Sequence, residues 1–409
     1  MAVRLEIMLR PELFDAAGDS VRRQAKEYFG LEFTRVRLIQ ILTFEAELTA
    51  AELEAIRTEV FTNPVTEVSS FRPLARHFDW AVWVGLRPGV RDNPGATGLE
   101  AVEAFLGRSL GPAAALYTSS LYLFEGDGIS QPEMTKIARE LLANDIIQEF
   151  RLFGPEDWDP KIGVGLILPQ VRLDHQPLVT TLAIDSNETL QRLSQQRNLA
   201  LREQDIPIIR RYYLRPEVQA RRQHLGLNLP TDVEVETIAQ ARSDHCNHNT
   251  FRGIFDYRDL ETGESATIKS LFKTCIEEPT LSLAQEKPWV VSVLWDNAGV
   301  GAFDDEFNYV ITGETHNSPS NMEAYGGSLT GIVGVYRDPL GTGLGAKLVA
   351  GLYGFCVGHR DYQGSLRPRL HPRRLLDGVI AGVKDGGNKS GIPTPLGFVH
   401  FHDSYLGNV

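Results

Sequence analysis

The chain has 409 residues, which at about 100–200 residues per domain is enough for two to four domains. Its composition, 42% hydrophobic and 23% charged, is ordinary for a globular protein, and its longest apolar runs fall far short of the roughly 20 residues that cross a bilayer. The net charge of −12 repels nucleic-acid phosphates, and no basic stripe with interleaved aromatic residues offsets that repulsion. Composition therefore predicts a modular protein with no transmembrane helix and no nucleic-acid partner.

The N-terminus and the cysteines bear on the compartment. Charged residues from Arg4 to Arg10 interrupt the stretch where a signal peptide needs an unbroken apolar run. The cysteines Cys246, Cys275 and Cys356 are widely spaced and include no CxxC pair, which argues against a disulfide framework and against a thiolate zinc site. We therefore expect a cytoplasmic protein with reduced thiols.

The first 155 residues contain an internal repeat. Its matched positions are Leu9-Arg10-Pro11, Asp15 and Gly18 in the first copy and Leu86-Arg87-Pro88, Asp92 and Gly95 in the second. Each copy opens with alternating apolar residues and continues with an amphipathic helix, a second strand, a second helix and a short final strand. The last three of these elements are expected at 36–44, 49–61 and 65–71, and again at 115–124, 131–142 and 146–152. We predict two small βαβ-type units, at about 1–75 and 76–155, that pack as an internal pseudo-dimer.

The remaining chain divides into a connector, a helical segment and a glycine-rich lobe. Four prolines between Phe153 and Pro177 discourage regular structure, so a domain boundary is expected there. Residues 187–241 are rich in helix formers and charge, and we assign residues 156–240 to a connector and a helical linker domain. From residue 241 to residue 409, glycine loops alternate with strand-like runs such as 332–336, and the chain ends in a strand without a closing helix. That ending suggests a truncated domain.

The first polar cluster runs from Ser243 to Asn249. His245 and His248 are three residues apart and lie on one side of a helix if the segment is helical. Such a pair suits proton transfer or phosphate contact, whereas a capped helix start with two exposed histidines explains it equally well. The His-x-x-His spacing is too common to specify a metal.

The second cluster, from Thr312 to Ser320, follows a strand-like run at 307–311. It places the carboxylate of Glu314, the imidazole of His316 and several short polar donors in one turn. This density suits a phosphate bridged by a metal ion, with the carboxylate on the ion and the donors on the substrate. An ordinary loop is the alternative, because Thr, Asn, Ser and Pro also form turns.

A third, glycine-rich cluster runs from Glu323 to Gly331 and leads through an apolar strand to Arg337 and Asp338. Neither the Walker spacing nor GxGxxG is present, so a plain P-loop or Rossmann interpretation fails. The Arg-Asp pair is ambiguous by itself, because most such pairs are surface ion pairs. The basic run at 366–374 is interpreted as a solvated loop broken by prolines rather than as a phosphate site.

In this order, the motifs resemble those of phosphoribosylformylglycinamidine synthases. That family has a Ser-Glu-His-Cys segment, a Glu-Thr-His-Asn-His-Pro loop, a glycine-rich turn and an Arg-Asp pair. The similarity continues upstream over 183–213 and 229–246 and downstream over 380–397. The twin N-terminal units resemble a fused, duplicated form of the family's small accessory subunit.

The resemblance implies an α+β fold: tandem accessory units, a helical linker, and the first α/β lobe of an aminoimidazole-ribonucleotide-synthase-like domain at 241–409. It also implies a ligase that uses ATP and Mg²⁺ to convert formylglycinamide ribonucleotide to the amidine in purine biosynthesis. Glutamine-derived ammonia would come from a fused or separate glutaminase. The active site would be completed by a C-terminal synthase lobe, so this chain alone is expected to be inactive.

The resemblance also assigns roles residue by residue. His245 and His316 match catalytic histidines, His316 being the proton acceptor. His248 and Thr312 fall on positions that contact ATP, and Glu314 and Asp338 match magnesium ligands. The substrate-binding positions are Thr315, His316, Asn317, Ser318 and Arg337.

Several positions depart from the family pattern. Asp244 stands for a usual glutamate, Asn249 for a lysine, Ser318 for a histidine and Thr312 for a lysine that contacts ATP. The loss of a cation at residue 312 weakens the inferred ATP contact most. Two alternatives therefore stay open: another member of the superfamily, such as aminoimidazole ribonucleotide synthase, and a degenerate paralogue that binds a nucleotide or a partner without catalysis.

Overall fold

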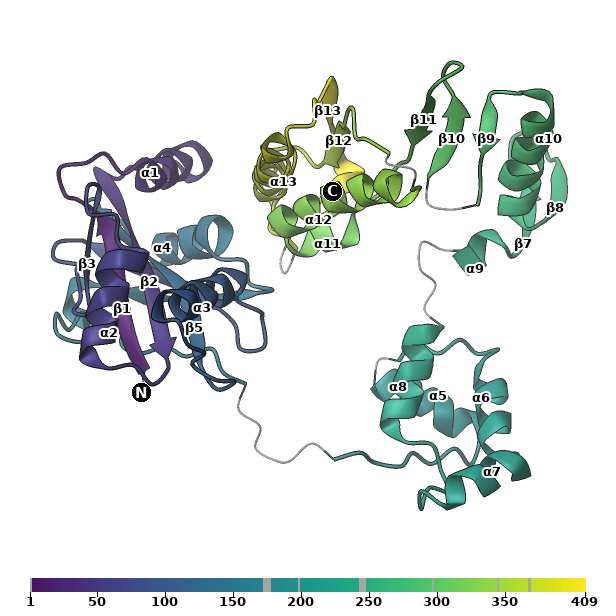
Figure 1. Ribbon diagram of the computed structural model, residues 1–409, viewed down its shortest axis with the longest axis horizontal. Helices are drawn as coiled ribbons and strands as arrows, with labels where there is room; N and C mark the ends of the chain where they lie inside the picture. The colour runs from purple at the N-terminus through teal and green to yellow at the C-terminus, as the bar shows by residue number, and fades with distance from the viewer. Residues whose placement is uncertain are drawn as a thin grey trace. The chain divides into compact units, whose positions relative to one another are not determined.

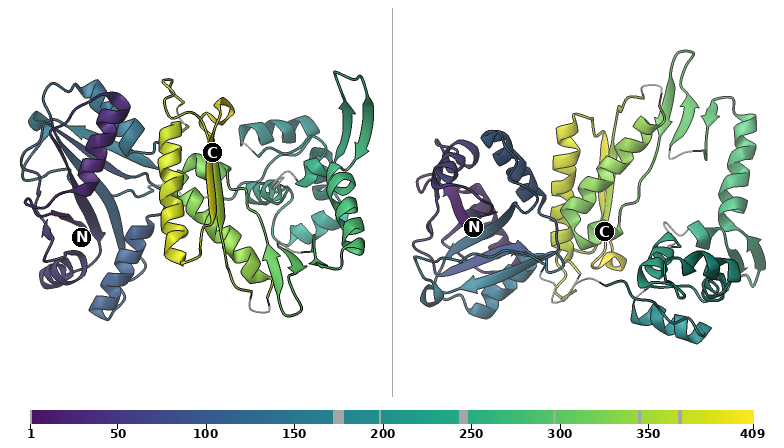
Figure 2. Two further views of the ribbon diagram at one scale, coloured as in Figure 1. Left: turned by 90° about the horizontal axis from the view of Figure 1, so that it is seen from above. Right: turned by 60° about the horizontal axis from the view of Figure 1, so that its bottom comes forward.

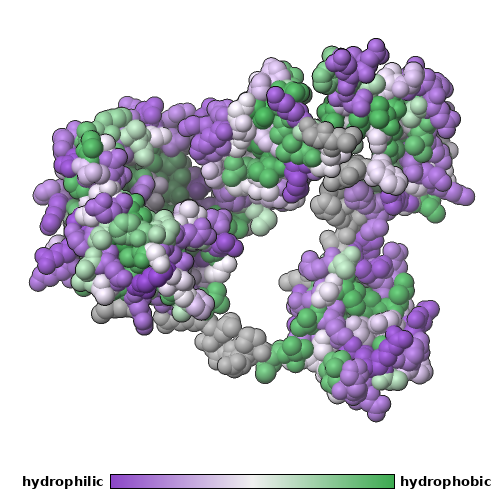
Figure 3. Space-filling view, viewed as in Figure 1, coloured by the Kyte–Doolittle hydropathy of each residue, from purple (hydrophilic) through white to green (hydrophobic). Residues whose placement is uncertain are grey.

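The computed structural model forms two compact units, one made of Met1–Val171 with Val310–Val409 and the other of Arg172–Tyr309 (Figure 1). The residues it describes are 2–171, 178–197, 199–242, 248–295, 298–343, 346–366 and 369–409. Among these residues, no helix is both long enough and apolar enough to cross a membrane. Hydrophilic residues predominate on the face drawn in Figure 3, with smaller hydrophobic patches between them.

The N-terminal domain, residues 2–171, is a six-stranded antiparallel sheet with helices on one face. The strand order is β3-β1-β2-β5-β4-β6, so the two sequence copies meet at the β2–β5 pair. The first copy consists of β1 (Ala2–Leu9), α1 (Ala16–Phe29), β2 (Arg35–Glu45), α2 (Ala50–Ala55), a π-helical turn (Ile56–Phe61) and β3 (Glu67–Ser70). The second consists of β4 (Trp80–Leu86), α3 (Asn93–Leu106), β5 (Ala115–Glu125), α4 (Gln131–Ile137), a π-helical turn (Ala138–Leu142) and β6 (Gln148–Phe153).

The matched residues of the two copies make the same local contacts. Asp15 accepts hydrogen bonds from Gly18 N, at 2.8 Å, and from β2, and Asp92 accepts them from Gly95 N, at 2.8 Å, and from β5. Both aspartates are therefore helix N-caps that also tie the helix to the neighbouring strand. A Cβ at either glycine would lie 2.1 Å from a strand carbonyl, so only glycine fits. The shared sequence positions thus mark one backbone geometry, used twice.

Alternation along the strands divides the core between the two faces of the sheet. On the helix-bearing face, α1 packs with α4 over Val82 and Val84, while the π-helical turn Ile56–Phe61 packs with α3 over Leu5 and Ile7. Helices from the two copies therefore share each cluster. The opposite face, which includes Trp83, is covered by apolar residues of the connector at 158–167. The connector thus belongs structurally to the N-terminal domain.

The lobe, residues 310–409, is built around a parallel strand pair with a helical crossover. Strand β12 (Leu352–Val357) pairs in parallel with β13 (Leu396–Phe401), and α13 (Pro372–Gly386) connects them. Helices α11 (Ser318–Met322) and α12 (Ala324–Gly341) precede this unit, and 3-10 turns follow at Asn388–Ser390 and Asp403–Tyr405. Every residue of β13 is exposed, apolar side chains included.

The strand expected at 332–336 is wrong, because these residues lie inside α12. β-branched Ile332, Val333 and Val335 favour a strand locally. The helix prevails because Gly327 and Gly331 let it approach a neighbouring segment closely: a Cβ at Gly327 would lie 2.5 Å from the backbone of Ser320. Tertiary packing outweighs local propensity here.

The second unit, residues 172–309, contains helices and short strands. Its helices α5 (Asn187–Gln196), α6 (Ile206–Tyr213), α7 (Pro216–Gln223) and α8 (Asp232–Ala241) occupy the segment expected to be helical. Ile184, Leu190, Ile206, Ile209 and Val235 are buried in one core there. The elements that follow are α9 (His248–Phe251), the hairpin β7 (Ile254–Arg258) and β8 (Ser265–Lys269), a π-helical turn (Lys273–Glu277), α10 (Glu278–Glu286), β9 (Val290–Ser292) and β10 (Gly299–Ala302). Strand β11 (Asn308–Ile311) joins β10 and β9 in a three-stranded sheet and leads into the lobe.

Candidate functional site

The candidate site is the loop between β11 and α11 together with the face of α12 against which it packs. The loop contains Glu314 and His316, and α12 contains Asp338. Glycines 331 and 334 occupy the same helix face as residue 338, because positions three and four apart are neighbours on a helix. The two segments that the sequence motifs single out are therefore in contact.

Glu314 lies against Gly334. A Cβ at residue 334 would be 3.7 Å from Cδ and 3.8 Å from Oε2 of Glu314. Asp338 follows one turn later on the same face, and residues so related have Cβ atoms roughly 5–6 Å apart. The Asp338 side chain is 13% exposed, whereas the Glu314 residue is exposed. The structure thus brings two carboxyl groups, one partly sheltered and one open to solvent, to one side of the helix.

His316 packs against Gly331 of the same helix. A Cβ at residue 331 would be 2.9 Å from Cβ and 3.1 Å from Cγ of His316, so the ring lies directly over the glycine. The loop is held by Ser320, whose Oγ donates to the His316 carbonyl oxygen at 2.6 Å. Nδ1 of His316 is buried and has no hydrogen-bond partner among the described residues. Buried polar atoms are normally satisfied, so this nitrogen is a polar group that a ligand or water could complete.

Three further proposed substrate-binding residues lie on this loop or where α11 begins, and the fourth lies on α12. Thr315, Asn317 and Ser318 are exposed, and Asn317 caps α11 by accepting a hydrogen bond from Ser318 N at 2.9 Å. The Arg337 side chain is 75% exposed, and its Nε lies 4.0 Å from Oδ1 of Asp338. Short donors therefore lie on the loop that carries Glu314, and a guanidinium lies next to Asp338 on α12.

Of the three remaining residues predicted for the site, Thr312 lies next to this loop. Thr312 is half-buried between β11 and the loop. His248 is exposed and begins α9 in the other unit. His245 lies outside the described residues.

The donor set fits a magnesium ion only together with a phosphate. Among the described residues, no group of three or more His, Cys, Asp and Glu side chains could hold a metal ion. Mg²⁺ in proteins is commonly bound by one or two carboxylates, with waters and substrate phosphates completing the octahedron. Glu314 and Asp338 offer that partial set of hard oxygen ligands. A permanent metal centre made only of protein ligands is not what this arrangement supports.

The interpretation of the basic run as a solvated loop is wrong for its last residues. Arg373 and Arg374 lie in the first turn of α13 and contact the N-terminal domain. The sequence did not predict this role, because the carbonyl oxygens that accept these hydrogen bonds lie far away in the chain. It also missed Gly331 and Gly334 as supports of the site, although a spacing of glycines by three and four residues is a helical signal.

Two family models match the chain. Residues 190–249 match the formylglycinamide ribonucleotide amidotransferase linker domain, and residues 295–409 match the N-terminal domain of AIR synthase related proteins. The first match begins inside α5 and covers α6–α8, and the second covers the lobe with its candidate site. The order of the two matches is the order that the sequence motifs predict.

Curated relatives extend this similarity. The chain is 31% identical over 209 residues to the phosphoribosylformylglycinamidine synthase subunit PurL of Picrophilus torridus, an alignment that covers 51% of this chain and 23% of that protein. It is 33% identical over 180 residues to the subunit of the same name from Thermoplasma volcanium, covering 44% of this chain and 20% of the relative. For the Granulibacter bethesdensis subunit of the same name, the identity is 37% over 126 residues, which covers 31% of this chain and 16% of that protein. The chain thus matches no more than about a quarter of the length of these relatives.

Proposed function

We propose that this chain, similar to the N-terminal portion of phosphoribosylformylglycinamidine synthases, forms part of a ligase that makes an amidine in purine biosynthesis. In the proposed reaction, ATP phosphorylates the amide oxygen of formylglycinamide ribonucleotide, and ammonia derived from glutamine then displaces the phosphate. The observation that carries the proposal is the meeting of the Glu314 loop with the Asp338 face of α12. The match of residues 190–249 to the linker domain favours this enzyme over aminoimidazole ribonucleotide synthase.

Each site residue has a role in this proposal. Glu314 and Asp338 would hold a magnesium ion, which draws charge from the phosphates of ATP during transfer. Arg337, exposed beside them, would bind an anionic oxygen of the substrate. The imidazole of His316 would accept a proton from the attacking ammonia, since a neutral histidine is a competent base near neutral pH.

The remaining donors would fix the ribotide. Thr315 and Ser318 present hydroxyl groups, and Asn317 presents an amide whose oxygen already caps α11. His245, His248 and Thr312 would contribute to catalysis and to binding ATP, as their motif positions imply. The duplicated N-terminal domain would serve as a fused form of the accessory subunit, and the remaining synthase lobe and glutaminase would act as partners.

The test replaces each carboxylate by its amide in the full protein that contains this chain. We expect Glu314→Gln and Asp338→Asn each to reduce magnesium-dependent turnover of formylglycinamide ribonucleotide by at least about a hundredfold, the loss typical of an electrostatic group at the reacting centre. The control is Asp305→Asn, an exposed carboxylate in the loop between β10 and β11. Unchanged turnover in both site variants would refute the assignment, and no turnover by the wild-type protein would favour a non-catalytic paralogue.

A further inference from the structure

Helix α13 lies between the N-terminal domain and α12, and it contacts both (Figure 2). Toward α12 it presents glycines. A Cβ at Gly378 would be 2.6 Å from the Ala324 Cβ, and a Cβ at Gly382 would be 2.6 Å from the Tyr325 carbonyl oxygen. Helices packed this closely cannot shift separately without collision.

Toward the N-terminal domain, α13 presents charge. Arg374 donates to the carbonyl oxygens of Ala143 and Leu142, at 2.6 and 3.4 Å. These carbonyls end the helical segment that follows α4, where the helix dipole favours a cation. Burial lowers the pKa of Arg374, because desolvation disfavours its charged form. The two carbonyls are its hydrogen-bond acceptors, and the nearby carboxylates of Glu323 and Asp145 also favour its charged form.

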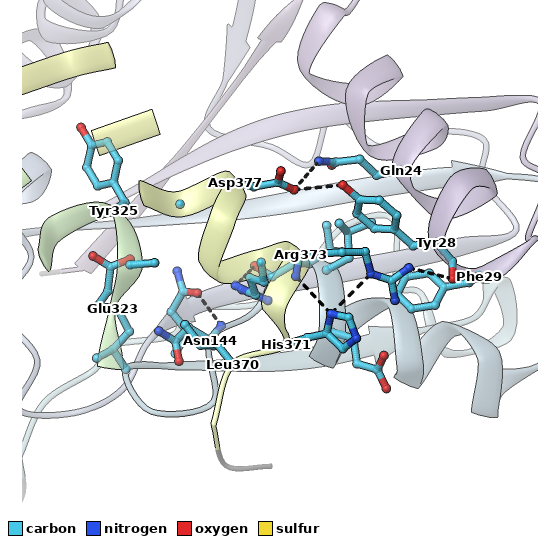
Figure 4. Close-up of a pocket in the computed structure, with 18 residues that line it drawn as sticks. Gln24, Tyr28, Phe29, Asn144, Glu323, Tyr325, Leu370, His371, Arg373 and Asp377 are labelled. Atoms are coloured by element: carbon cyan, nitrogen blue, oxygen red, sulfur yellow. Dashed lines mark hydrogen bonds between the residues drawn. The ribbon is translucent and has the colours of Figure 1, made fainter. Parts of the chain in front are cut away.

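A pocket of about 310 Å³ lies where α13 meets the N-terminal domain, and Figure 4 draws it. Arg373 lies over the Tyr28 ring at 4.4 Å from its centre, and Tyr28 donates to Asp377 at 3.0 Å. On the other side, the Asn144 side-chain amide donates to the Met322 carbonyl oxygen at 2.8 Å, directly before α12 begins. The N-terminal domain therefore contacts α13 along its first turns and also binds the end of α11, two residues before α12 begins.

We infer that Arg374 is a positioning residue. It fixes α13 to the N-terminal domain and thereby determines the position of α12, the helix that carries Asp338 and contacts Glu314. The chain of contacts is continuous. Leu142 and Ala143 hold Arg374, the α13 glycines hold α12, and Gly334 of α12 holds Glu314. The importance of Arg374 for metal binding rests on the proposed function, whereas its effect on α12 does not.

The first experiment measures hydrogen–deuterium exchange in the 409-residue chain. We expect Arg374→Met to speed exchange in peptides from α12 by about tenfold, the loss that removal of a charged hydrogen-bond donor produces. Arg374→Lys should recover much of the protection, since an ammonium group can still donate to one carbonyl. The matched control is Arg210→Met, because Arg210 likewise donates to two successive carbonyls, those of Ile184 and Asp185, but in the other unit. Unchanged α12 exchange in Arg374→Met, or an equal rise in Arg210→Met, would overturn the inference.

The second experiment measures binding of Mn²⁺, as a stand-in for Mg²⁺, by electron paramagnetic resonance with ATP present, because the two carboxylates need phosphate oxygens to complete the coordination of the ion. We expect Glu314→Gln to abolish binding and Arg374→Met to weaken it by about threefold to tenfold, with Arg374→Lys close to wild type. If wild-type protein binds no Mn²⁺, or if Glu314→Gln binds it normally, the proposed metal site is wrong. The positioning role of Arg374 is then tested by hydrogen–deuterium exchange alone. If Glu314→Gln loses binding while Arg374→Met retains it, the positioning role is wrong although the metal site stands.

Discussion

Alanine substitution of the α12 glycines should separate helix propensity from packing. At Gly334 the nearest atom to an added Cβ is 3.7 Å away, an ordinary contact. At Gly331 the nearest atom is 2.9 Å away, in the His316 side chain. At Gly327 it is 2.5 Å away, in the backbone of Ser320, which cannot rotate aside. The three positions share one helix and differ in the space available.

The expected magnitudes follow from two opposing effects. Replacing glycine by alanine inside a helix stabilises it by about 0.8–1 kcal/mol, while overpacking costs about 1–3 kcal/mol. Gly334→Ala should therefore stabilise α12, and Gly331→Ala should be neutral to about 2 kcal/mol destabilising, with His316 displaced. Gly327→Ala should be the most destabilising of the three, because the backbone must move.

The assay is hydrogen exchange of α12 amides, since a chain with several domains does not give one well-defined free energy of unfolding. Gly334→Ala should slow exchange, whereas Gly327→Ala should accelerate it. The reverse order, or equal effects at all three positions, would refute the claim that close packing explains these glycines. A stabilising Gly327→Ala variant would be sufficient to do so.

Two further predictions concern other parts of the chain. Asp15→Ala and Asp92→Ala should each destabilise the helix that follows by about 1–2 kcal/mol, because each removes an N-cap that also bonds a strand amide. Faster hydrogen exchange of the α1 and α3 amides would show this loss, and similar losses in both copies are expected. In the helical unit, the hydrogen bond from Arg222 lowers the pKa of Glu234 from 4.5 to about 2. Since this folded-state pKa is below the unfolded value, the stabilisation is present above about pH 4.5 and disappears as the pH falls toward 2. Circular dichroism of Glu234→Gln across that window should show a weaker pH dependence than wild type, and an unchanged profile would contradict the assignment.

The sequence determined the repeat and much of its geometry. Asp15 and Gly18, with their counterparts Asp92 and Gly95, are local requirements, since a cap and a glycine in close backbone contact depend on few neighbours. Alternating apolar residues likewise fixed which strand faces are buried. The residue types of the candidate site could also be predicted from the sequence, because a carboxylate, an imidazole and short hydrogen-bond donors are concentrated in one loop.

Only the tertiary structure decided how these pieces meet. Residues 332–336 read locally as a strand, but close packing through Gly327 and Gly331 makes them helical. Arg374 read as part of a solvated basic loop, but its partners, Leu142 and Ala143, lie far away in sequence. Local pattern encodes propensity and burial, whereas the identity of a distant partner depends on backbone approach, which no single segment specifies. For the same reason, the sequence named the candidate ligands, while the folded chain placed the Glu314 loop against the helix that carries Asp338.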